Sequence, residues 1–411
     1  MRITLFVVAT ILAATFPARA AAPLDIAEAV SLALAAADPS LVRYEEQAAA
    51  FEARAVADSQ LPDPKLRLGL SNLPVDNFRF DQEDMTMGEI MISQEFSRGN
   101  SRALRRAKRQ AEADAERAAR ALREAEIVRE TRDAWIELRY WLTAKDKVGK
   151  SRQAVAEMME AAKSIFASGR GTAQDVLRAE LELSLLDDRL LDIERQTERA
   201  RARLARFIGA AASRSLGEQA MLPPPAAPEI ILESLAHHPA VISDGARITA
   251  MDREVALAEE QYKPGFELEA GYGLRGGGRT DFATIGVSFD LPLFVAKRQD
   301  RNVAAARHER QAATLDRDAR LLDLRQLLET TYADWRRGKD RVALYEKAVT
   351  ARARWTAEAA LTAYQSGVSD FADLIRARLA DLESSLSLER LRADRAQAQA
   401  MLLFLQGESH D

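Results

Sequence analysis

Residues 168–179 read SGRGTAQDVLRA, and residues 366–377 read SGVSDFADLIRA. Each stretch begins with Ser-Gly, passes through a short segment, and ends with Asp, two apolar residues, Arg and Ala. Other residues recur at the same spacing of about 200 positions, namely Pro39 and Pro239, Pro64 and Pro264, and Trp135 and Trp335. A self-similarity of this length indicates one supersecondary unit that is used twice.

The first repeat, residues 21–209, is predicted to contain helices, a β-hairpin at about 65–96 and a long α-hairpin at about 99–207. No proline interrupts the first helix of that α-hairpin, so we expect an almost unbroken helix about 100 Å long. Its apolar positions are mostly Ala, which lets neighbouring helix axes approach closely. Thr172 is the predicted N-cap of the return helix.

The second repeat, residues 230–407, is predicted to have the same order, with its β-hairpin at about 265–293 and its long α-hairpin at about 297–405. The Pro-rich segment 210–229 would link the repeats, and residues 408–411 would form a short tail. The pattern therefore predicts a mainly α fold with a small β part, built from a duplicated helix, β-hairpin and long α-hairpin.

The predicted strands alternate between apolar and polar or small residues. In the first repeat, Leu66, Leu68 and Leu70 would share one face, and the runs 266–274 and 283–293 alternate in the same way. A period of two with one apolar face is typical of a strand whose two faces meet different surroundings. The Gly-rich turn between the last two runs lacks the Lys-Ser/Thr of a phosphate-binding loop, so we interpret it as a hairpin turn.

The N-terminus reads as an export signal. Arg2 precedes an apolar run at residues 3–16, and Ala18-Arg19-Ala20 resembles a cleavage site. The apolar run is too short to span a membrane as a helix. We therefore interpret residues 1–20 as a cleaved signal peptide, with a retained N-terminal anchor as the alternative.

The composition limits the class of protein. Without Arg2 and Arg19, the chain has 56 basic and 63 acidic residues, and this balance argues against general binding to nucleic acids. No cysteine is present, so an exported chain must be held together by packing or oligomerisation, and no lipid can be attached to a Cys. After the signal, no apolar run approaches the 20 residues of a transmembrane helix.

Four short strands with apolar faces are too few to close a barrel, for which about eight are needed. Open strand edges favour pairing with other copies of the chain, and two copies would supply 8 strands while three would supply 12. Closed barrels are the form in which strands cross a membrane, because every backbone polar group must be satisfied there. The apolar faces would then contact lipid, and the polar faces would line an aqueous lumen.

The chain resembles the TolC-like outer membrane factors over nearly all of its mature length. The resemblance rests on the repeat, the two predicted hairpins, and the Ser-Gly turns followed by Asp, two apolar residues, Arg and Ala. The stretch LPDPKL at residues 61–66, with Asn72-Leu73-Pro74 after it, is similar to the heavy-metal-efflux branch of that family. The resemblance implies a homotrimer with a 12-stranded transmembrane β-barrel and a periplasmic α-helical barrel. It also implies a periplasmic adaptor (membrane fusion protein) and an inner-membrane RND-type pump as partners.

The turns between the long helices would form the periplasmic tips, which in this family contact the adaptor and close the entrance. The candidate residues at the tips are Ser168, Gly169, Gly171, Thr172, Asp175, Ser366, Gly367, Ser369, Asp373 and Arg376. Asp373 falls where the family often has an entrance carboxylate. A second acidic position of some members is Arg376 here, so an Asp373–Arg376 pair is the alternative to a purely acidic gate. Asp175 has a simpler alternative role, because an acid at this position stabilises a helix N-terminus.

The candidate residues of the lumen lie on the polar strand faces and are Met85, Met87, Glu89, Met91, Glu267 and Glu269. Thioether sulfur suits soft ions such as Cu(I), so weak handling of metal ions is one interpretation of the methionines. Flexible packing at the lumen or rim is the other. No two of the four histidines have ligand spacing, and we predict no bound metal and no cofactor.

Two further groups of residues have structural alternatives. Basic residues follow the second and fourth predicted strands, where they would lie at the level of the inner-leaflet headgroups or form solvated helix faces. These are Arg98, Arg102, Arg105, Arg106, Lys108, Arg109, Lys297, Arg298 and Arg301. The four tryptophans, Trp135, Trp141, Trp335 and Trp355, are expected to pack between helices.

No nucleophile elbow, paired-histidine zinc motif or Walker sequence occurs, so we do not expect an enzyme. The preferred interpretation is an exit duct of the outer membrane of a Gram-negative bacterium. It would extend into the periplasm, contact outer-membrane lipid, and export substrates delivered by a pump, with metal ions preferred. The alternatives are the exit duct of a type I protein secretion system and, in a different class, a soluble periplasmic coiled-coil adaptor or scaffold.

Overall fold

The structure is a computed structural model that describes residues 22–169, 171–218 and 222–407. The predicted signal peptide at residues 1–20 and the predicted tail at residues 408–411 lie outside the described residues.

The two repeats contain the same elements in the same order. In the first, two helices precede two strands and two long helices: α1 (Ile26–Ala35), α2 (Pro39–Ala57), β1 (Lys65–Ser71), β2 (Met87–Phe96), α3 (Ser101–Ala167) and α4 (Ala173–Ile208). The second contains α5 (Pro228–Ser234), α6 (Pro239–Glu259), β3 (Gly265–Arg275), β4 (Phe282–Asp290), α7 (Gln299–Leu344), α8 (Thr350–Gln365) and α9 (Phe371–Leu405). Short 3₁₀ turns connect several of these helices, and a π-helical turn at Tyr345–Val349 joins α7 to α8.

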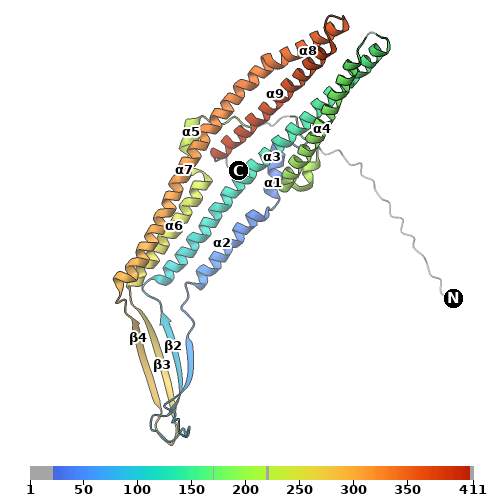
Figure 1. Ribbon diagram of the computed structural model, residues 1–411. Coiled ribbons are helices and arrows are strands. Elements are labelled where there is room, and N and C mark those ends of the chain that lie inside the picture. The colour runs from blue at the N-terminus through green and yellow to red at the C-terminus, as the bar shows by residue number, and fades with distance from the viewer. Residues whose placement is uncertain (1–21, 170, 219–221, 408–411) are drawn as a thin grey trace, which may run out of the picture.

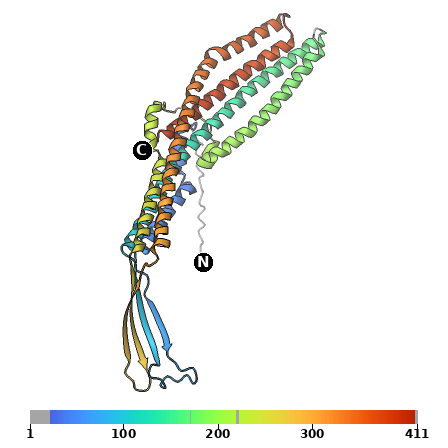
Figure 2. The ribbon, with the colours of Figure 1, turned by 60° about the vertical axis from the view of Figure 1, so that its left-hand side comes forward.

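The molecule is long and narrow, with the sheet at one end and two helical tips at the other (Figure 1). Helices α2, α3, α6 and α7 continue from the strands, and the α3–α4 and α8–α9 hairpins form the far half (Figures 1 and 2). Near the sheet, α2 packs on α3, α3 on α6, and α6 on α7. Toward the tips, α4 packs on α3, α3 on α9, and α9 on α8.

The predicted unbroken helix is confirmed as α3, which contains 67 residues. Its polar surface is stabilised by ion pairs to α2, including Arg109 Nε to Asp58 at 2.7 Å and Arg120 Nε to Glu45 at 2.8 Å. Trp135 in its middle is fully buried, and its indole N–H donates to the carbonyl of Leu24 at 3.1 Å. No helix in the described part of the chain is long and apolar enough to cross a membrane.

The four strands form one antiparallel sheet in the order β1-β2-β3-β4. Its register joins the two hairpins so that residues of like character lie side by side. One row across the sheet is Leu68, Ile90, Tyr272 and Ala283, and the adjacent row on the other face is Arg67, Met91, Gly271 and Thr284. The predicted alternation is therefore confirmed, and it gives the whole sheet one apolar face and one polar face.

Three details differ from the sequence-based expectations. The second long helix is interrupted by the π-helical turn, where the Thr350 hydroxyl donates to the Tyr345 carbonyl at 2.8 Å. Trp355 does not pack between helices of the chain, because its side chain is 65% exposed. Met85 precedes β2 and is exposed, so it does not share a strand face with Met87 and Met91.

Candidate functional site

The apolar face of the sheet is uncovered in the single chain. Large side chains on it are exposed in all four strands, and Ile285 in β4 is 86% exposed. At the end next to the helices, an aromatic row crosses three strands: the Phe96 and Phe266 rings stack at 4.8 Å, and the Phe266 and Phe289 rings lie 6.3 Å apart. An apolar band this exposed needs a partner, and its aromatic border resembles the girdles that mark membrane interfaces.

The polar face of the sheet carries the candidate lumen acids. Glu267 lies directly opposite Glu95 on the neighbouring strand, and Glu269 lies opposite Ser93. Glu89 lies between Gly69 and Gly273. None of these carboxylates has an ion pair within the described part of the chain. Like charges placed opposite each other destabilise a sheet, so this face is suited to contact with water.

The methionines of this face fill space left by glycines. A Cβ atom at Gly273 would lie 2.7 Å from the Met87 sulfur, and one at Gly271 would lie 3.5 Å from the Met91 methyl carbon. Met87 and Met91 are four residues apart on one strand, a separation of about 13 Å. The described residues contain no cluster of His, Cys, Asp or Glu suited to a metal.

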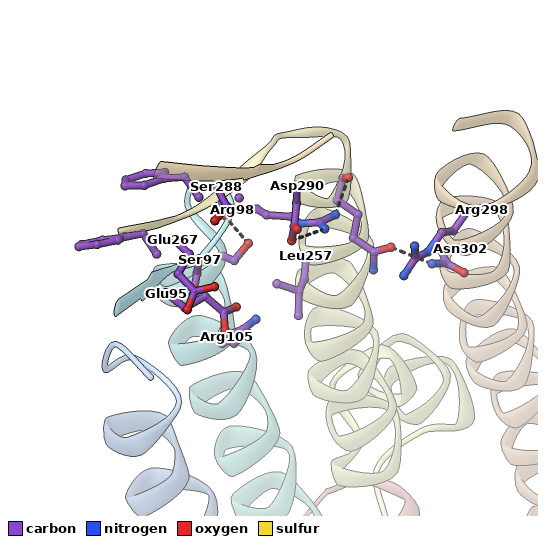
Figure 3. Close-up of a pocket in the computed structure, with 15 residues that line it drawn as sticks. Glu95, Ser97, Arg98, Arg105, Leu257, Glu267, Ser288, Asp290, Arg298 and Asn302 are labelled. Carbon is purple, nitrogen blue, oxygen red and sulfur yellow. Dashed lines mark hydrogen bonds and ion pairs between the residues drawn. The ribbon is translucent and has the colours of Figure 1, made fainter. Parts of the chain in front are cut away.

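A polar cavity of about 600 Å³ lies where the strands meet the helices (Figure 3). Arg98 ties its walls together: one guanidinium nitrogen donates to Asp290 at 3.2 Å and another to the Gln261 carbonyl at 3.3 Å. The Asn302 amide donates to the Gln261 side chain at 2.7 Å. Its lining mixes cationic side chains such as Arg105 and Arg298 with anionic ones such as Glu95 and Asp290.

Several of the basic groups that follow the strands form ion pairs or line the cavity, and Arg98 does both. Arg98, Lys108 and Arg109 form ion pairs with acidic residues of other elements, respectively Asp290, Glu254 and Asp58. Arg105 and Arg298 line the cavity in Figure 3. The sequence pattern located these groups but not their partners, because Arg98 and Asp290 are 192 residues apart.

The first tip joins α3 to α4 through Gly169, whose φ of +74° favours glycine. A Cβ atom at Gly171 would lie 3.1 Å from the Phe166 amide nitrogen, so this position is also close to the helix end. Thr172 is confirmed as the N-cap of α4, and its hydroxyl accepts from the Asp175 amide at 3.2 Å. The Asp175 carboxylate in turn accepts from the Thr172 amide at 3.4 Å, which completes a capping box, and it also accepts from the Thr172 hydroxyl at 2.8 Å.

The second tip joins α8 to α9 through Gly367, which has a φ of +73°. The Ser366 hydroxyl donates to the Thr362 carbonyl at 2.9 Å, and the Ser369 hydroxyl oxygen is buried without a hydrogen-bond partner within the described residues. Asp373 and Arg376 form an exposed ion pair at 3.2 Å. This tip and the first lie at the same end of the molecule (Figures 1 and 2).

Sequence reasoning missed the residue that caps α9. The carboxylate of Asp370 accepts from the Asp373 amide at 2.8 Å. Asp370 stands immediately before the helix and three residues before Asp373, which is a typical N-cap position and could have been recognised.

The chain has two lateral edges. Each has exposed apolar side chains and a strand that lacks a neighbour on its outer side. One edge consists of β1, α2 and α4, and it exposes Val56 together with Leu177, Leu181 and Leu185, which follow one another at helical spacing. The other consists of β4, α7 and α8, and it exposes Leu315, Leu322 and Trp355.

Comparison with known proteins agrees with this architecture. Residues 230–408 match the family model described as outer membrane efflux protein. The outer membrane protein VceC from Vibrio cholerae has 18% sequence identity and a TM-score of 0.76, with 94% of this chain and 97% of VceC covered. The second repeat of this chain therefore matches the outer membrane efflux protein family. The family match covers the second repeat, while the similarity in fold extends over both.

Two further solved structures share the fold of this chain. The outer-membrane channel OprN has 16% identity and a TM-score of 0.77, with 93% of this chain and 90% of OprN covered. CusC, whose structures are described in terms of folding and transmembrane channel formation, has 13% identity and a TM-score of 0.76, with 94% of this chain and 93% of CusC covered. No curated protein matches the sequence.

Proposed function

We propose that this chain is an outer membrane efflux protein, that it is the exit duct of a tripartite efflux system, and that it acts as a homotrimer. The observation that carries the proposal is the sheet, whose register joins both hairpins into one uncovered apolar face and leaves the outer edges of β1 and β4 without a neighbouring strand. The family match and the fold shared with outer membrane channels support it.

Membrane insertion explains why the apolar face is uncovered. Lipid would contact the row that includes Leu68, Ile90 and Tyr272, and the polar face with its unpaired carboxylates would line a water-filled lumen. The aromatic row of Phe96, Phe266 and Phe289 would lie at the periplasmic interface. Because lipid offers no hydrogen bonds to backbone groups, the edges of β1 and β4 must pair with other copies.

The two lateral edges explain how copies would assemble. In a ring, β4 of one copy would lie antiparallel to β1 of the next, and the exposed side chains of α7 and α8 would face those of α2 and α4. Such a head-to-tail contact must close after a fixed number of copies. Three copies would give 12 strands, a barrel wide enough to keep an aqueous channel.

The partners and the substrate are finer parts of the proposal. The tips at Gly169 and Gly367 would contact a periplasmic adaptor, and an inner-membrane RND-type pump would supply the energy. Asp373 would contribute to closing the entrance. Metal ions are the proposed substrates, on the resemblance of residues 61–66 to the heavy-metal-efflux branch.

Two adjacent residues of β4 provide a test. Ile285 lies on the apolar face and Thr284 on the polar face, and both are exposed in the single chain. A cationic side chain facing the middle of a bilayer costs about 2–4 kcal/mol, whereas one facing the lumen does not. We therefore expect Ile285→Arg to reduce the amount of heat-modifiable trimer in outer-membrane fractions, and Thr284→Arg to leave it unchanged.

The wild-type protein is the first control. A soluble periplasmic species without heat-modifiable trimers would reject the duct and favour a scaffold. Equal effects of Ile285→Arg and Thr284→Arg on the trimer would show that the apolar face does not meet lipid.

A further inference from the structure

The helices α2 and α6 begin at equivalent positions of the two repeats but with different caps. Asp38 caps α2 immediately before Pro39, and His238 caps α6 immediately before Pro239. Both side chains are buried, with exposed fractions of 5% for Asp38 and 1% for His238. A carboxylate and an imidazole respond differently to acid, so the two caps differ in chemistry although they occupy the same place in the fold.

His238 is held by both of its ring nitrogens. Nδ1 accepts a hydrogen bond from the Ala240 amide at 3.2 Å, and Nε2 lies 3.2 Å from the Phe404 carbonyl oxygen near the end of α9. An amide N–H can only donate and a carbonyl can only accept, so the proton of the neutral ring is assigned to Nε2. The ring also meets the Phe404 ring edge-on, with centroids 4.8 Å apart.

A second proton has no place in this arrangement. It would bind to Nδ1, turn an acceptor into a donor facing the Ala240 N–H, and put positive charge at the N-terminus of α6, where the helix dipole disfavours it. Two groups act in favour of the charged ring, first the Phe404 carbonyl that accepts from Nε2 and then, more weakly, the carboxylate of Glu126 on α3; Arg129 lies over the Phe404 ring at 5.7 Å. Burial is the largest effect and lowers the pKa of His238 below its usual value.

We propose that His238 is an acid-sensitive clip between the start of α6 and the C-terminal end of α9. Protonation of the buried ring removes the cap bond from Ala240 and favours an open, hydrated form of the contact in which α9 no longer packs on the ring, although Nε2–H can still donate to the Phe404 carbonyl. The end of α9 packs in a small apolar cluster that contains Leu402, Leu405 and, from α5, Ile231. Releasing the clip would loosen the C-terminal end of α9, the helix whose N-terminal end forms part of the second tip.

The equivalent contact in the first repeat resists acid. Arg206 at the end of α4 lies 2.5 Å from the Asp38 carboxylate, which also accepts from the Ser40 amide at 2.8 Å. These bonds favour the charged form and hold the pKa of Asp38 well below its usual range. Between about pH 4 and pH 6.5 only the clip of the second repeat is therefore expected to weaken.

Hydrogen exchange of the purified full-length protein tests the proposal, which is independent of transport. Because folding lowers the pKa of His238, acid favours the open form of the clip. The equilibrium constant for closing the clip is therefore constant above pH 6.5 and falls by up to tenfold per pH unit below it. After correction for intrinsic exchange rates, we expect protection of amides in residues 400–407 to fall about tenfold between pH 7.5 and pH 5.5.

The matched variants are His238→Asn and His237→Asn. Asparagine is a good N-cap that does not titrate, so His238→Asn should keep the protection of residues 400–407 nearly constant over this pH range. His237 is the exposed neighbour, and its variant should behave like the wild type. The proposal is overturned if wild-type protection does not depend on pH, or if His238→Asn shows the wild-type dependence. If His238→Asn does not fold, the pH dependence of hydrogen exchange in the wild-type protein decides the question alone.

Discussion

Asp175 and Asp373 occupy the same position in the two repeats, yet their side chains have different partners. The Asp175 carboxylate accepts from both the amide and the hydroxyl of Thr172, and the bond from the amide completes the capping box of α4. In the second repeat, Asp370 caps α9, and Asp373 instead forms an exposed ion pair with Arg376. A duplicated acid has thus kept a structural role in one tip and is available for another role in the second.

The same asymmetry extends along the two halves. The first repeat has a continuous helix in α3 and an ion-paired cap at Asp38, whereas the second has a π-helical turn between α7 and α8 and a histidine cap. π-helical turns and titratable caps are both places where a helix can change its geometry at small cost. We infer that the first repeat is the more rigid of the two, and each prediction below compares equivalent residues.

The largest difference is expected between the two equivalent tryptophans. Trp135 is fully buried and its indole donates to the Leu24 carbonyl, while Trp335 is only partly buried beside the cluster at Leu324 and Leu402. Trp135→Ala should lower the free energy of unfolding by about 3–5 kcal/mol because it creates a cavity and removes the indole hydrogen bond to the Leu24 carbonyl. Trp335→Ala should cost about 1–2 kcal/mol.

Denaturant titrations of the two variants in the same detergent would measure this difference. Equal losses of stability would mean that the two halves have comparable cores and would contradict the asymmetry. Trp135→Phe is a useful control, since it keeps most of the apolar volume and isolates the loss of the hydrogen bond.

The next prediction concerns the cap at Asp38. Arg206→Ala should cost about 1–2 kcal/mol, because it leaves a buried carboxylate without its cation although Arg206 itself is half exposed. The pKa of Asp38 is lowered in the folded state, so the wild-type contribution is present above the unfolded pKa of about 4 and is lost as pH falls further.

Thermal unfolding between pH 3 and pH 7 would test this dependence. The gap in Tm between the wild type and Arg206→Ala should be constant above about pH 5 and should narrow below pH 4. A gap that widened at low pH would mean that another group controls the stability of this cap.

A smaller loss is expected at the two helix caps of the tips. Thr172→Ala and Asp370→Ala should each lower stability by about 1 kcal/mol, because each removes the side chain that accepts from an unpaired amide at the helix N-terminus. Limited proteolysis at the tips would report the loss locally. If Asp370→Ala left the second tip as resistant as before, Asp373 would have to be able to replace it as a cap.

The accuracy of the sequence-based expectations depended on whether a feature was local. Alternation along 266–274 and the absence of proline in α3 are local patterns, and both elements were predicted correctly. The pairing of β2 with β3, which aligns Ile90 with Tyr272, brings together residues about 180 positions apart, and no local pattern encodes such a register. The partner of Arg98 could not be predicted for the same reason, and the π-helical turn has no reliable sequence signal.

The tips show the same limit. Thr172 was recognised as a cap because Ser and Thr before a helix are a strong local signal, whereas Asp370 was overlooked beside Asp373. The division of roles between Asp370 and Asp373 becomes visible only when the hydrogen bond to the Asp373 amide is known. Which carboxylate of the second tip is available for a gate therefore cannot be predicted from the first repeat, because the side-chain geometry differs between the two tips.

The smallest effect on stability and the sharpest functional contrast are expected at Asp373. Its pair with Arg376 is exposed, so Asp373→Asn should change the free energy of unfolding by less than about 0.5 kcal/mol. If Asp373 helps close the entrance, removing its charge should raise the single-channel conductance of the reconstituted protein and the leakage of antibiotics into cells. Asp175→Asn, the equivalent change, should weaken a cap but leave conductance unchanged, because the Asp175 side chain is engaged with Thr172. Unchanged conductance in Asp373→Asn would remove Asp373 from the gate, and a rise in both variants would mean that loosening either tip opens the entrance, whichever charge is lost.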